Sequence, residues 1–543
     1  MPVPAGGVFG FSIRVPTASD LDSLTAAELR DLVLGLLAEV AALKQTVAAQ
    51  REEIARLKGL KGPPTIKPSG MEPATAPSGT KPTRDKPRRG KVSPRVSVED
   101  HALSVTAPTG SRFKGYETYL VQEVIVSVRA LRYRRERWVT PDGRTILAPL
   151  PAGIDGHFGP NLRRLVLMLY HQGQSTLARV VGLLRSIGVA ISERQVQRLL
   201  TERHDGFLCE ARDVLRAGLA SAAWISVDDT GARHRVANAF CTQIGDDRFT
   251  YFATRATKSR LNFLDLLRAG HTDFVLNQTA FDYMRERGLS ATLIDRLGGA
   301  EAKSFADRST WLAHLNQLGI GAAKPGQAVI QDPVQLATEG ALWGSIWAHG
   351  YLRGSVVLSD DAGQFAVGQH ALCWVHAERL VHKLDTFTDR HRAAQQRMRS
   401  LIWDFYASLK AYRANPNRQR RTVLRARFDR IFRRRTGFAT LDRLLARLRA
   451  NKAELLKVLE RPEVPLHTNG SENDIRCQVT RRKVSAGTRS DQGRDCRDAF
   501  LGLAKTCAKL GVAFWDYLGS RLGVPDMVVP PLRELIRCRG QPA

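Results

Sequence analysis

The sequence contains no cysteine before Cys209, and none of its seven cysteines is followed by another three positions later. This distribution argues against a disulfide framework and against a four-cysteine zinc site, so we expect a protein of the reducing cytosol. The first twenty residues lack a basic segment followed by an apolar run, and no uncharged apolar stretch reaches about 18 residues. We therefore expect neither secretion nor a membrane-spanning helix.

Acidic residues are scarce relative to basic ones. The chain has 82 lysine and arginine residues against 53 aspartate and glutamate residues, a formal net charge of +29. Such an excess favours a polyanionic partner, and DNA, RNA and a membrane surface all meet that description. A length of 543 residues with 43% hydrophobic residues allows three or four domains, at least one of them with a large core.

Residues 20–60 carry a heptad pattern that predicts a parallel two-stranded coiled coil, and hence a homodimer. β-Branched residues at the a positions with leucine at most d positions favour two strands. Leu32, Leu34 and Leu37 add apolar surface outside this seam, so a helix packed on its own chain is the alternative. The a positions are Val33, Val40, Val47 and Ile54, and the d positions are Leu29, Leu36, Leu43, Gln50 and Leu57.

Two further segments precede the central part of the chain. Residues 61–98 are rich in proline, lysine, arginine, serine and glycine, which predicts a disordered basic linker. Within residues 99–155, valines at 121, 124, 126 and 128 and the turn Pro141-Asp142-Gly143 predict a small β module.

Residues 156–215 are expected to hold a helix-turn-helix. Three short helices are predicted at 162–170, 176–185 and 193–200, with breaks at Gly173 and Gly188 and with Ser192 as the N-cap of the last. An ordinary helical bundle is the alternative. In a helix-turn-helix, the last helix would face the DNA major groove. The candidate DNA-binding side chains on it are Arg194, Gln195, Gln197 and Arg198.

Three acidic residues stand in settings that predict a shared metal site. Asp228 and Asp360 close short β-branched runs at 224–229 and 354–360, and Glu472 opens a helix-like segment. Carboxylate oxygens so placed can hold divalent metal ions, which also bind phosphates. Taken singly, each acid has a simpler role as a turn or N-terminal helix residue.

The order of elements around these acids predicts a ribonuclease H-like core over residues 220–520. After the run at 224–229 come alternating runs at 235–244 and 248–254, a helix at 258–268 and then the strand that ends in Asp360. Helical insertions are expected at about 270–350 and 385–460, and residues 521–543 as a C-terminal tail. The fold class is thus a multidomain α+β protein: coiled coil, small β module and helix-turn-helix, then an α/β catalytic core with helical insertions.

From the zipper to about residue 520, the sequence resembles the insertion sequence 66 family of transposases, in the DDE group. The motifs that carry the resemblance are Asp228-Asp229-Thr230, Asp360-Asp361-Ala362-Gly363, Cys373-Trp374-Val375-His376-Ala377-Glu378-Arg379, Asn469-Gly470-Ser471-Glu472-Asn473-Asp474-Ile475-Arg476 with Arg482-Lys483, and Lys505-Thr506-Cys507-Ala508-Lys509-Leu510-Gly511 through Trp515-Asp516-Tyr517-Leu518.

The resemblance implies that Asp228, Asp360 and Glu472 hold two Mg²⁺ or Mn²⁺ ions for cleavage at transposon ends and strand transfer. Two aspartates precede Ala362-Gly363, and we favour Asp360 over Asp361 because it ends the hydrophobic strand. Family members commonly carry a cysteine-rich zinc module near the N-terminus, yet no cysteine precedes Cys209, so no zinc is expected there. The remaining motif residues comprise phosphate-binding candidates, Arg476, Arg482 and Lys483, and residues without an assigned role, Asp229, Cys373, His376 and Asn469.

The expected partners follow from the same reading. They are double-stranded DNA as transposon end and target, a second copy of the chain or a higher oligomer, and small accessory proteins of the element, with no membrane. The expected location is the cytoplasm, at the nucleoid. Two other functions stay open: a ribonuclease H-like nuclease or resolvase without strand transfer, and a catalytically inactive DNA-binding regulator.

Overall fold

The computed structural model describes residue 25 and residues 97–151, 154, 156–321 and 332–539. The chain divides into two units, Met1–Gly70 and Met71–Ala543. All helices and strands reported below belong to the second unit. The predicted coiled coil at 20–60 and nearly all of the predicted linker at 61–98 lie outside the described residues.

The predicted β module is reduced to one hairpin, formed by β1 (Arg137–Val139) and β2 (Thr145–Leu147). Its turn contains Gly143 at φ +80°, a conformation that suits glycine. Residues 116–136 form neither helix nor strand, and the four valines at 121–128 are exposed. The strands expected there do not form, and among the described residues no second apolar surface covers these side chains.

The three helices of the predicted helix-turn-helix occur at the expected places. The first continues from α4 (Pro160–Leu167) into a π-helical turn, η1 (Met168–Gln172), and the others are α5 (Leu177–Ser186) and α6 (Glu193–Thr201). Ser192 caps α6, because its hydroxyl accepts the backbone N–H of Gln195 while the Gln195 side chain accepts the Ser192 N–H. A longer helix, α7 (Asp205–Ser221), then leads to the sheet.

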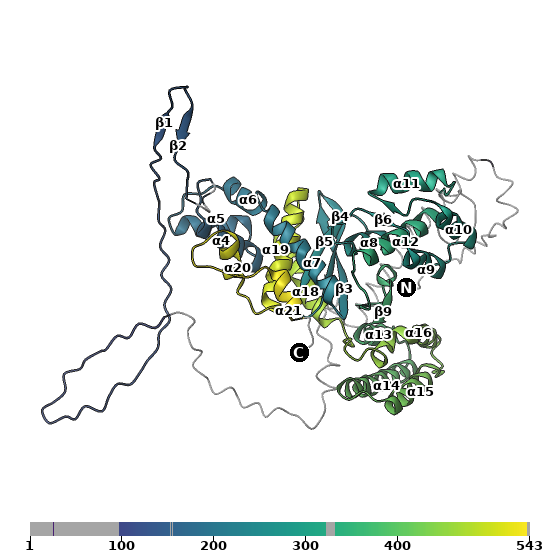
Figure 1. The fold of residues 1–543 in the computed structure, drawn as a ribbon. Helices are drawn as coiled ribbons and strands as arrows, with labels where there is room; N and C mark the ends of the chain where they lie inside the picture. The colour runs from purple at the N-terminus through teal and green to yellow at the C-terminus, as the bar shows by residue number, and fades with distance from the viewer. Residues whose placement is uncertain (1–24, 26–96, 152–153, 155, 322–331, 540–543) are drawn as a thin grey trace, which may run out of the picture. The chain divides into compact units, whose positions relative to one another are not determined.

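Five strands form a mixed sheet in the order β5-β4-β3-β8-β9 (Figure 1). The first three pair antiparallel, while β8 runs parallel to β3 and β9 parallel to β8. The strand expected from residue 235 begins two residues later, because Arg235 and Val236 form the hairpin turn. The strands are β3 (Trp224–His234), β4 (Ala237–Gly245), β5 (Thr250–Arg255), β8 (Val356–Ser359) and β9 (Gln369–Leu372).

The two faces of the sheet are covered by different parts of the chain. Side chains alternate along a strand, so Ile225 and Val227 of β3 enter the main hydrophobic core together with residues of α7. Ser226 lies on the opposite face, where its hydroxyl is hydrogen-bonded to that of Ser471 on α18 (Asn469–Ser485). Asp228, two residues further along β3, shares this second face.

Between β5 and β8 lies the first helical insertion, which follows α8 (Arg260–Leu267). It holds a two-stranded antiparallel sheet in addition to helices. The buried helix α12 packs against α8, α9 and β6 and contributes much of the insertion's share of the main core. The elements are β6 (Phe274–Val275), α9 (Gln278–Glu286), α10 (Ala291–Gly299), β7 (Ser304–Phe305), α11 (Arg308–Gln317) and α12 (Pro333–Ala348).

The second helical insertion builds a hydrophobic core of its own, centred on Trp374, Phe405 and Phe428. A short 3-10 turn, η2 (Gly363–Phe365), precedes β9 and leads toward this region. After α13 (Trp374–His382), which contributes Trp374, the elements of this insertion are α14 (Asp389–Ala414), α15 (Arg418–Phe432), α16 (Ala439–Ala450), α17 (Lys452–Leu455) and the 3-10 turn η3 (Lys457–Leu459).

After α18, three more helices return to the start of the described fold: α19 (Asp491–Lys509), α20 (Phe514–Arg521) and α21 (Leu532–Cys538). Helix α19 packs on β5 and α7, and α21 packs on α7. The segment predicted as a tail from residue 521 therefore contains a packed helix, because Leu532 and Ile536 are fully buried. In the described ranges, no helix combines the length and apolar character that crossing a membrane requires.

Candidate active site

Asp228 and Asp360 lie side by side because β3 and β8 are parallel neighbours. The register pairs Ser226 with Leu358, and each aspartate follows two residues later. Burial raises the pKa of Asp228 to about 7; the hydrogen bond from the backbone N–H of Asp229 at 2.8 Å opposes this, and the carboxylate of Asp360 adds to it. Two close carboxyl groups of which one is reluctant to ionise form a site that a cation would stabilise.

Glu472 reaches the same region from the first turn of α18. Its carboxylate accepts a two-pronged hydrogen bond from Arg379 of α13, with 2.7 Å from Nη1 to Oε1 and 3.3 Å from Nη2 to Oε2. The Ser226–Ser471 contact fixes the start of α18 against β3. Glu472 is thus held at the start of α18 by an arginine partner, and α18 lies on the face of the sheet that carries Asp228.

His376 lies between these groups, on α13. Its Nε2 is 3.6 Å from Oε1 of Glu472, and its Nδ1 is 3.4 Å from the Thr468 hydroxyl. Burial opposes charge on His376 and on the neighbouring Cys373 thiol, but the hydrogen bond between them outweighs it. The pKa of His376 is therefore raised and that of Cys373 lowered. Cys373 itself is buried.

The aspartates next to the two site acids have other partners. Asp229 forms an ion pair with Lys258 and accepts a hydrogen bond from Gln364 Nε2 at 2.8 Å. Asp361 forms an ion pair with Arg447 of α16 and accepts a hydrogen bond from Asn451 Nδ2 at 3.2 Å. Asp360 instead accepts the backbone N–H of Ala362 at 3.1 Å, which shapes the loop after β8.

Within the described residues, one group of three potential metal ligands has its ligand atoms all within 4.8 Å of one another: His271, Asp273 and His349. The three acids above are more widely spaced than that. The two imidazole rings stack with centroids 3.5 Å apart and planes inclined by 13°. Nearly parallel rings cannot both point their lone pairs in-plane at one ion. This cluster, where His349 Nε2 lies 2.9 Å from Asp273 Oδ1, therefore ties the two ends of the first insertion together as an ion pair or hydrogen bond.

The candidate DNA-binding residues on α6 divide into two groups. Arg194, Gln197 and Arg198 are exposed, and Arg198 pairs with Glu202 along the helix at 3.0 Å. Gln195 is half-buried, and its amide oxygen is occupied by the capping interaction with Ser192. Gln195 is thus removed from the set of free side chains, because capping uses the group that base recognition would need.

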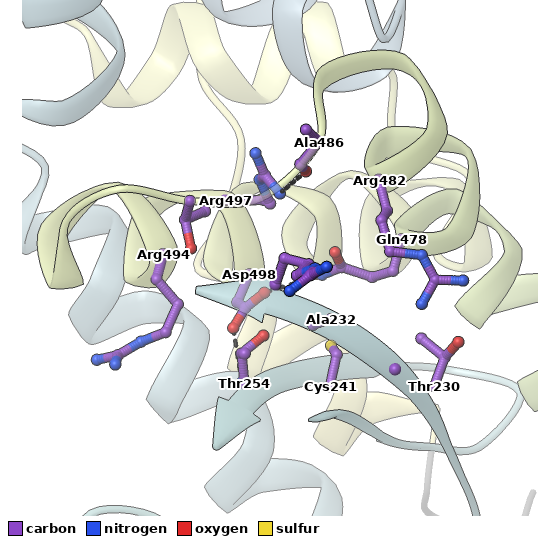
Figure 2. Close-up of a pocket in the computed structure, with 13 residues that line it drawn as sticks. Thr230, Ala232, Cys241, Thr254, Gln478, Arg482, Ala486, Arg494, Arg497 and Asp498 are labelled. Atoms are coloured by element: carbon purple, nitrogen blue, oxygen red, sulfur yellow. Dashed lines mark hydrogen bonds between the residues drawn. The ribbon is translucent and has the colours of Figure 1, made fainter. Parts of the chain in front are cut away.

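The basic candidates on α18 lie along one helix, with Arg476 and Lys483 exposed and Arg482 half-buried. Arg476 donates to Asn473 within the same helix at 3.0 Å. Arg482 lines a small pocket of about 20 Å³ together with Arg494 and Arg497, as Figure 2 shows. Asn469, the first residue of α18, takes no part in the contacts among the three acids that are described above.

The base of this pocket is a buried carboxylate, Asp498 (Figure 2). It accepts the backbone N–H of Thr254 at 2.7 Å and the Gln478 amide at 2.9 Å, and burial raises its pKa. These bonds connect β5, α18 and α19. The pocket holds no more than a water molecule, so its basic rim and acidic base act mainly to join these three elements.

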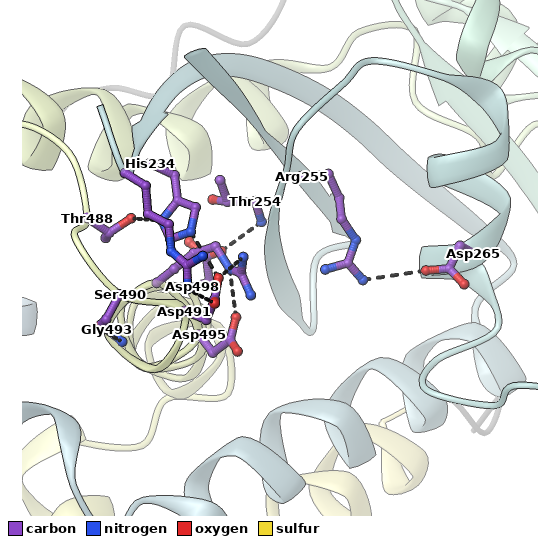
Figure 3. A network of polar contacts seen from close by, with 12 residues as sticks. His234, Thr254, Arg255, Asp265, Thr488, Ser490, Asp491, Gly493, Asp495 and Asp498 are labelled. Atoms are coloured by element: carbon purple, nitrogen blue, oxygen red, sulfur yellow. Dashed lines mark hydrogen bonds and ion pairs between the residues drawn. The ribbon is translucent and has the colours of Figure 1, made fainter. Parts of the chain in front are cut away.

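A second polar network fixes the far end of the β3–β4 hairpin to α19 (Figure 3). His234 is hydrogen-bonded to Thr488 at 2.8 Å and to Asp491 at 3.0 Å, and Arg494 donates to Asp491 at 2.9 Å. The backbone adds an Arg235 N–H bond to the Thr488 carbonyl at 2.8 Å. The long strand that carries Asp228 is thereby anchored beyond the site.

Sequence reasoning missed the basic residues that hold the acids. Arg379 is three positions after His376, so both face the same side of α13, and that spacing was the available signal. Lys258 carried no such signal, since only the folded sheet brings it to Asp229. Arg260 was also missed: it donates to the Gly363 carbonyl at 2.7 Å and pairs with the fully buried Glu339 at 3.5 Å.

Comparison with known proteins identifies the family. An uncharacterized protein of Sinorhizobium fredii, y4jO, is 49% identical over 326 residues, which is 60% of this chain and the whole of that protein. Residues 359–495 match the family described as Transposase IS66 family. The chain belongs to the IS66 transposase family. The segment that matches the IS66 family contains Asp360, His376 and Glu472, while Asp228 lies before it.

Proposed function

We propose that this IS66 family member is a metal-dependent DNA transposase that cleaves phosphodiester bonds at element ends and joins them to target DNA. The observation that carries the proposal is the approach of Asp228, Asp360 and Glu472 from β3, the end of β8 and α18. The family membership supports it. The three residues are distant in the sequence, and the β3–β8 register together with the Ser226–Ser471 contact supports a common site.

The proposed catalytic core is ribonuclease H-like. Three antiparallel strands followed by two parallel ones, in the order β5-β4-β3-β8-β9, are compatible with that fold. The first and second insertions then interrupt the core after α8 and after α13. The exposed side chains of α6 are proposed to contact DNA within a helix-turn-helix.

The donor set fits divalent cations. All three acids offer carboxylate oxygens, which Mg²⁺ prefers. Burial and the neighbouring carboxylate of Asp360 raise the pKa of Asp228, and a bound cation would favour its ionised form. We propose that Asp228, Asp360 and Glu472 would hold two ions, Mg²⁺ or Mn²⁺. When bound, such ions activate the attacking oxygen and stabilise the leaving oxygen of phosphoryl transfer.

The surrounding side chains position the acids for this role. Arg379 holds Glu472 in one orientation, Lys258 pairs with Asp229, and Arg260 fixes the loop after Asp360 through the Gly363 carbonyl. Arg476 and Lys483 remain exposed on α18 and are proposed to contact DNA phosphates. We further propose that the chain dimerises through residues 20–60 and works in the cytoplasm with small accessory proteins of its element.

The test uses labelled duplexes that carry the ends of the protein's own element, with Mg²⁺ or Mn²⁺. We expect Asp228→Asn, Asp360→Asn and Glu472→Gln each to lower both nicking and joining of pre-cleaved ends by about 100-fold or more, since each 1.4 kcal/mol of lost transition-state stabilisation costs about tenfold. Binding of the same duplex in EDTA should be retained, which separates loss of chemistry from loss of folding.

Asp361→Asn is the matched control. Its carboxylate is held by Arg447 on a partly exposed surface, and such pairs contribute about 0–1 kcal/mol, so activity should stay within about fivefold of the wild type. Loss of activity in Asp361→Asn with retention in Asp360→Asn would reverse the assignment. Hydrolysis without joining would identify a nuclease, and unchanged biological activity of Asp228→Asn would identify a non-catalytic regulator.

A further inference from the structure

The positive charge of the chain is concentrated in the second helical insertion. Residues 389–460 contain 20 lysine and arginine residues and six aspartate and glutamate residues, a net charge of +14. This segment of 72 residues therefore carries about half of the formal charge of +29. A charge so concentrated on one compact unit is an electrostatic footprint for a polyanion.

Part of this charge surrounds a groove between the end of α15 and α16, with a volume of about 540 Å³. Four arginine side chains and one lysine line it. Binding pockets for small organic ligands are mostly apolar, whereas this groove is bordered by guanidinium groups. Its basic residues are Arg433, Arg434, Arg435, Arg449 and Lys452.

Two acids, Asp429 and Asp442, line the groove and offset only part of its positive charge: Lys452 first, and then Arg433 and Arg449, lower the pKa of Asp429. Asp429 is bound by Lys452 at 2.7 Å, and Asp442 accepts the backbone N–H and the hydroxyl of Thr436, both at 2.8 Å. Across the described parts of the chain, the guanidinium groups of Arg433, Arg434, Arg435 and Arg449 form no ion pair or hydrogen bond, and all four residues are exposed. The groove therefore keeps a net positive charge, with five basic residues against two acids and with four exposed arginines whose hydrogen-bond donors are not taken up among the described residues.

The helix that forms one wall of the groove also contacts the candidate active site. Arg447 of α16 forms the ion pair with Asp361, and Asn451 just after α16 donates to the same carboxylate. Asp361 is the immediate neighbour of Asp360. The groove residue Arg449 thus lies between Arg447 and Asn451, the two residues that contact the loop after β8 through Asp361.

We propose that this basic groove, defined by Arg433, Arg434, Arg435, Arg449 and Lys452, binds the sugar–phosphate backbone of double-stranded DNA. The contact is independent of base sequence, because guanidinium groups reach phosphate oxygens by paired hydrogen bonds and none of these residues needs a base edge. That the bound duplex lies next to the proposed catalytic acids rests on the proposed function. The groove holds the duplex next to the phosphodiester that is cut.

The experiment measures binding of the full-length protein to a labelled duplex of arbitrary sequence, in EDTA, over a range of salt concentrations. The test variant is Arg433→Gln, Arg434→Gln, Arg435→Gln combined. The matched control, Arg285→Gln, Arg308→Gln, Arg537→Gln, removes the same charge from exposed positions elsewhere. We expect the test variant to weaken binding by about tenfold or more. The magnitude of the slope of log K against log salt should fall by about 2–3, because three phosphate contacts are lost. The control should show less than half of either effect.

A second variant leaves every arginine in place. Ala446 is an exposed groove residue of α16, so Ala446→Glu adds a carboxylate there at a cost in helix propensity of only a few tenths of a kcal/mol. It should weaken binding and leave the thermal unfolding temperature unchanged. Equal salt slopes for the test variant, the control and the wild type would overturn the proposal. So would a result in which the groove substitutions weaken binding to RNA but not to the DNA duplex. Because EDTA removes catalysis from the readout, Asp228→Asn should bind like the wild type even if the proposed chemistry is wrong.

Discussion

Adjacent aspartates in this protein differ in their partners rather than in their residue type. Asp229 and Asp361 are each bound by a basic side chain, whereas Asp228 and Asp360 face one another. A sequence pattern identifies the pair Asp-Asp but contains nothing that separates its two members. Lys258 and Arg447 separate them, and both come from segments that only the folded chain brings near.

His171 is another residue whose role depends on burial. It is 2% exposed, its ring stacks on Phe500 of α19 at 4.5 Å, and in the described structure its Nε2 has no hydrogen-bond partner. Burial lowers the pKa of His171 well below its ordinary value, and the nearby charge of Arg481 lowers it further. The unfolded chain therefore binds a proton more readily than the folded chain.

This pKa shift predicts that acid destabilises the protein. As pH falls below about 6.5, where an unfolded histidine becomes protonated, stability should decrease by up to about 1.4 kcal/mol per pH unit for His171. His171→Phe keeps the stacked ring and removes the titration, so the difference in unfolding free energy between pH 7.5 and pH 5.5 should shrink by about 1 kcal/mol. Urea unfolding measures both values. An unchanged pH dependence in His171→Phe would contradict the prediction.

At the scale of elements, the parts best predicted were those with strong local signals. The N-cap Ser192, the helices that follow Gly173 and Gly188, and the strand before Asp360 all lie within a few residues of their expected positions. Turn chemistry was less predictable: Arg235 and Val236 form the β3–β4 turn at φ +47° and +69°, a conformation that rarely accepts such residues. The anchoring of this hairpin to α19 supports it, and no sequence pattern reports that contact.

The valines at 121–128 show the reverse case, in which a clear sequence pattern is present but the predicted strand does not form. Their spacing is typical of a strand, yet a strand forms only where a neighbouring surface buries one face. The described chain offers them none, and they remain exposed. The motif residues predict the candidate site, and its three acids stay a prediction; Lys258 and Arg260, which contact the neighbouring Asp229 and Gly363, have no comparable sequence signal.

At the element scale, the close packing of α12 against β6 and α9 within the first insertion leads to a prediction. A methyl group on Gly344 would collide with the carbonyl oxygen of Val275 and lie 2.9 Å from Cβ of Ala280. Gly344→Ala should therefore lower the unfolding free energy by about 1–3 kcal/mol. In Gly298→Ala, the new methyl group meets nothing within 4 Å, so this control in α10 should be neutral or slightly stabilising. Equal unfolding midpoints for the two variants would be inconsistent with a tight α12–β6 contact.

At the scale of the whole molecule, the described chain contains separate hydrophobic cores. The main core joins α7, the sheet and the first insertion, while the second insertion encloses Trp374, Phe405 and Phe428. Since burial is the main source of stability, each core should respond separately to a cavity.

Phe428→Ala tests this division. Phe428 is fully buried, so its truncation should destabilise the second insertion by about 3–5 kcal/mol. Hydrogen exchange should accelerate in α14, α15 and α16 and change little in β3, β4 and β5. Uniform loss of protection across the described structure would show one cooperative unit instead. Phe428→Ala removes no titratable group, so it also serves as the control for His171→Phe: it should leave the pH dependence of the unfolding free energy unchanged.

The hydroxyl contact between Ser226 and Ser471 spans 245 positions of the chain. During synthesis, β3 leaves the ribosome long before the helix that carries Glu472 has been made. Neither a truncated product nor a nascent chain can bring the third acid to the first two. The proposed capacity to break DNA is therefore withheld from every copy that ends before α18 and requires translation to have passed that helix.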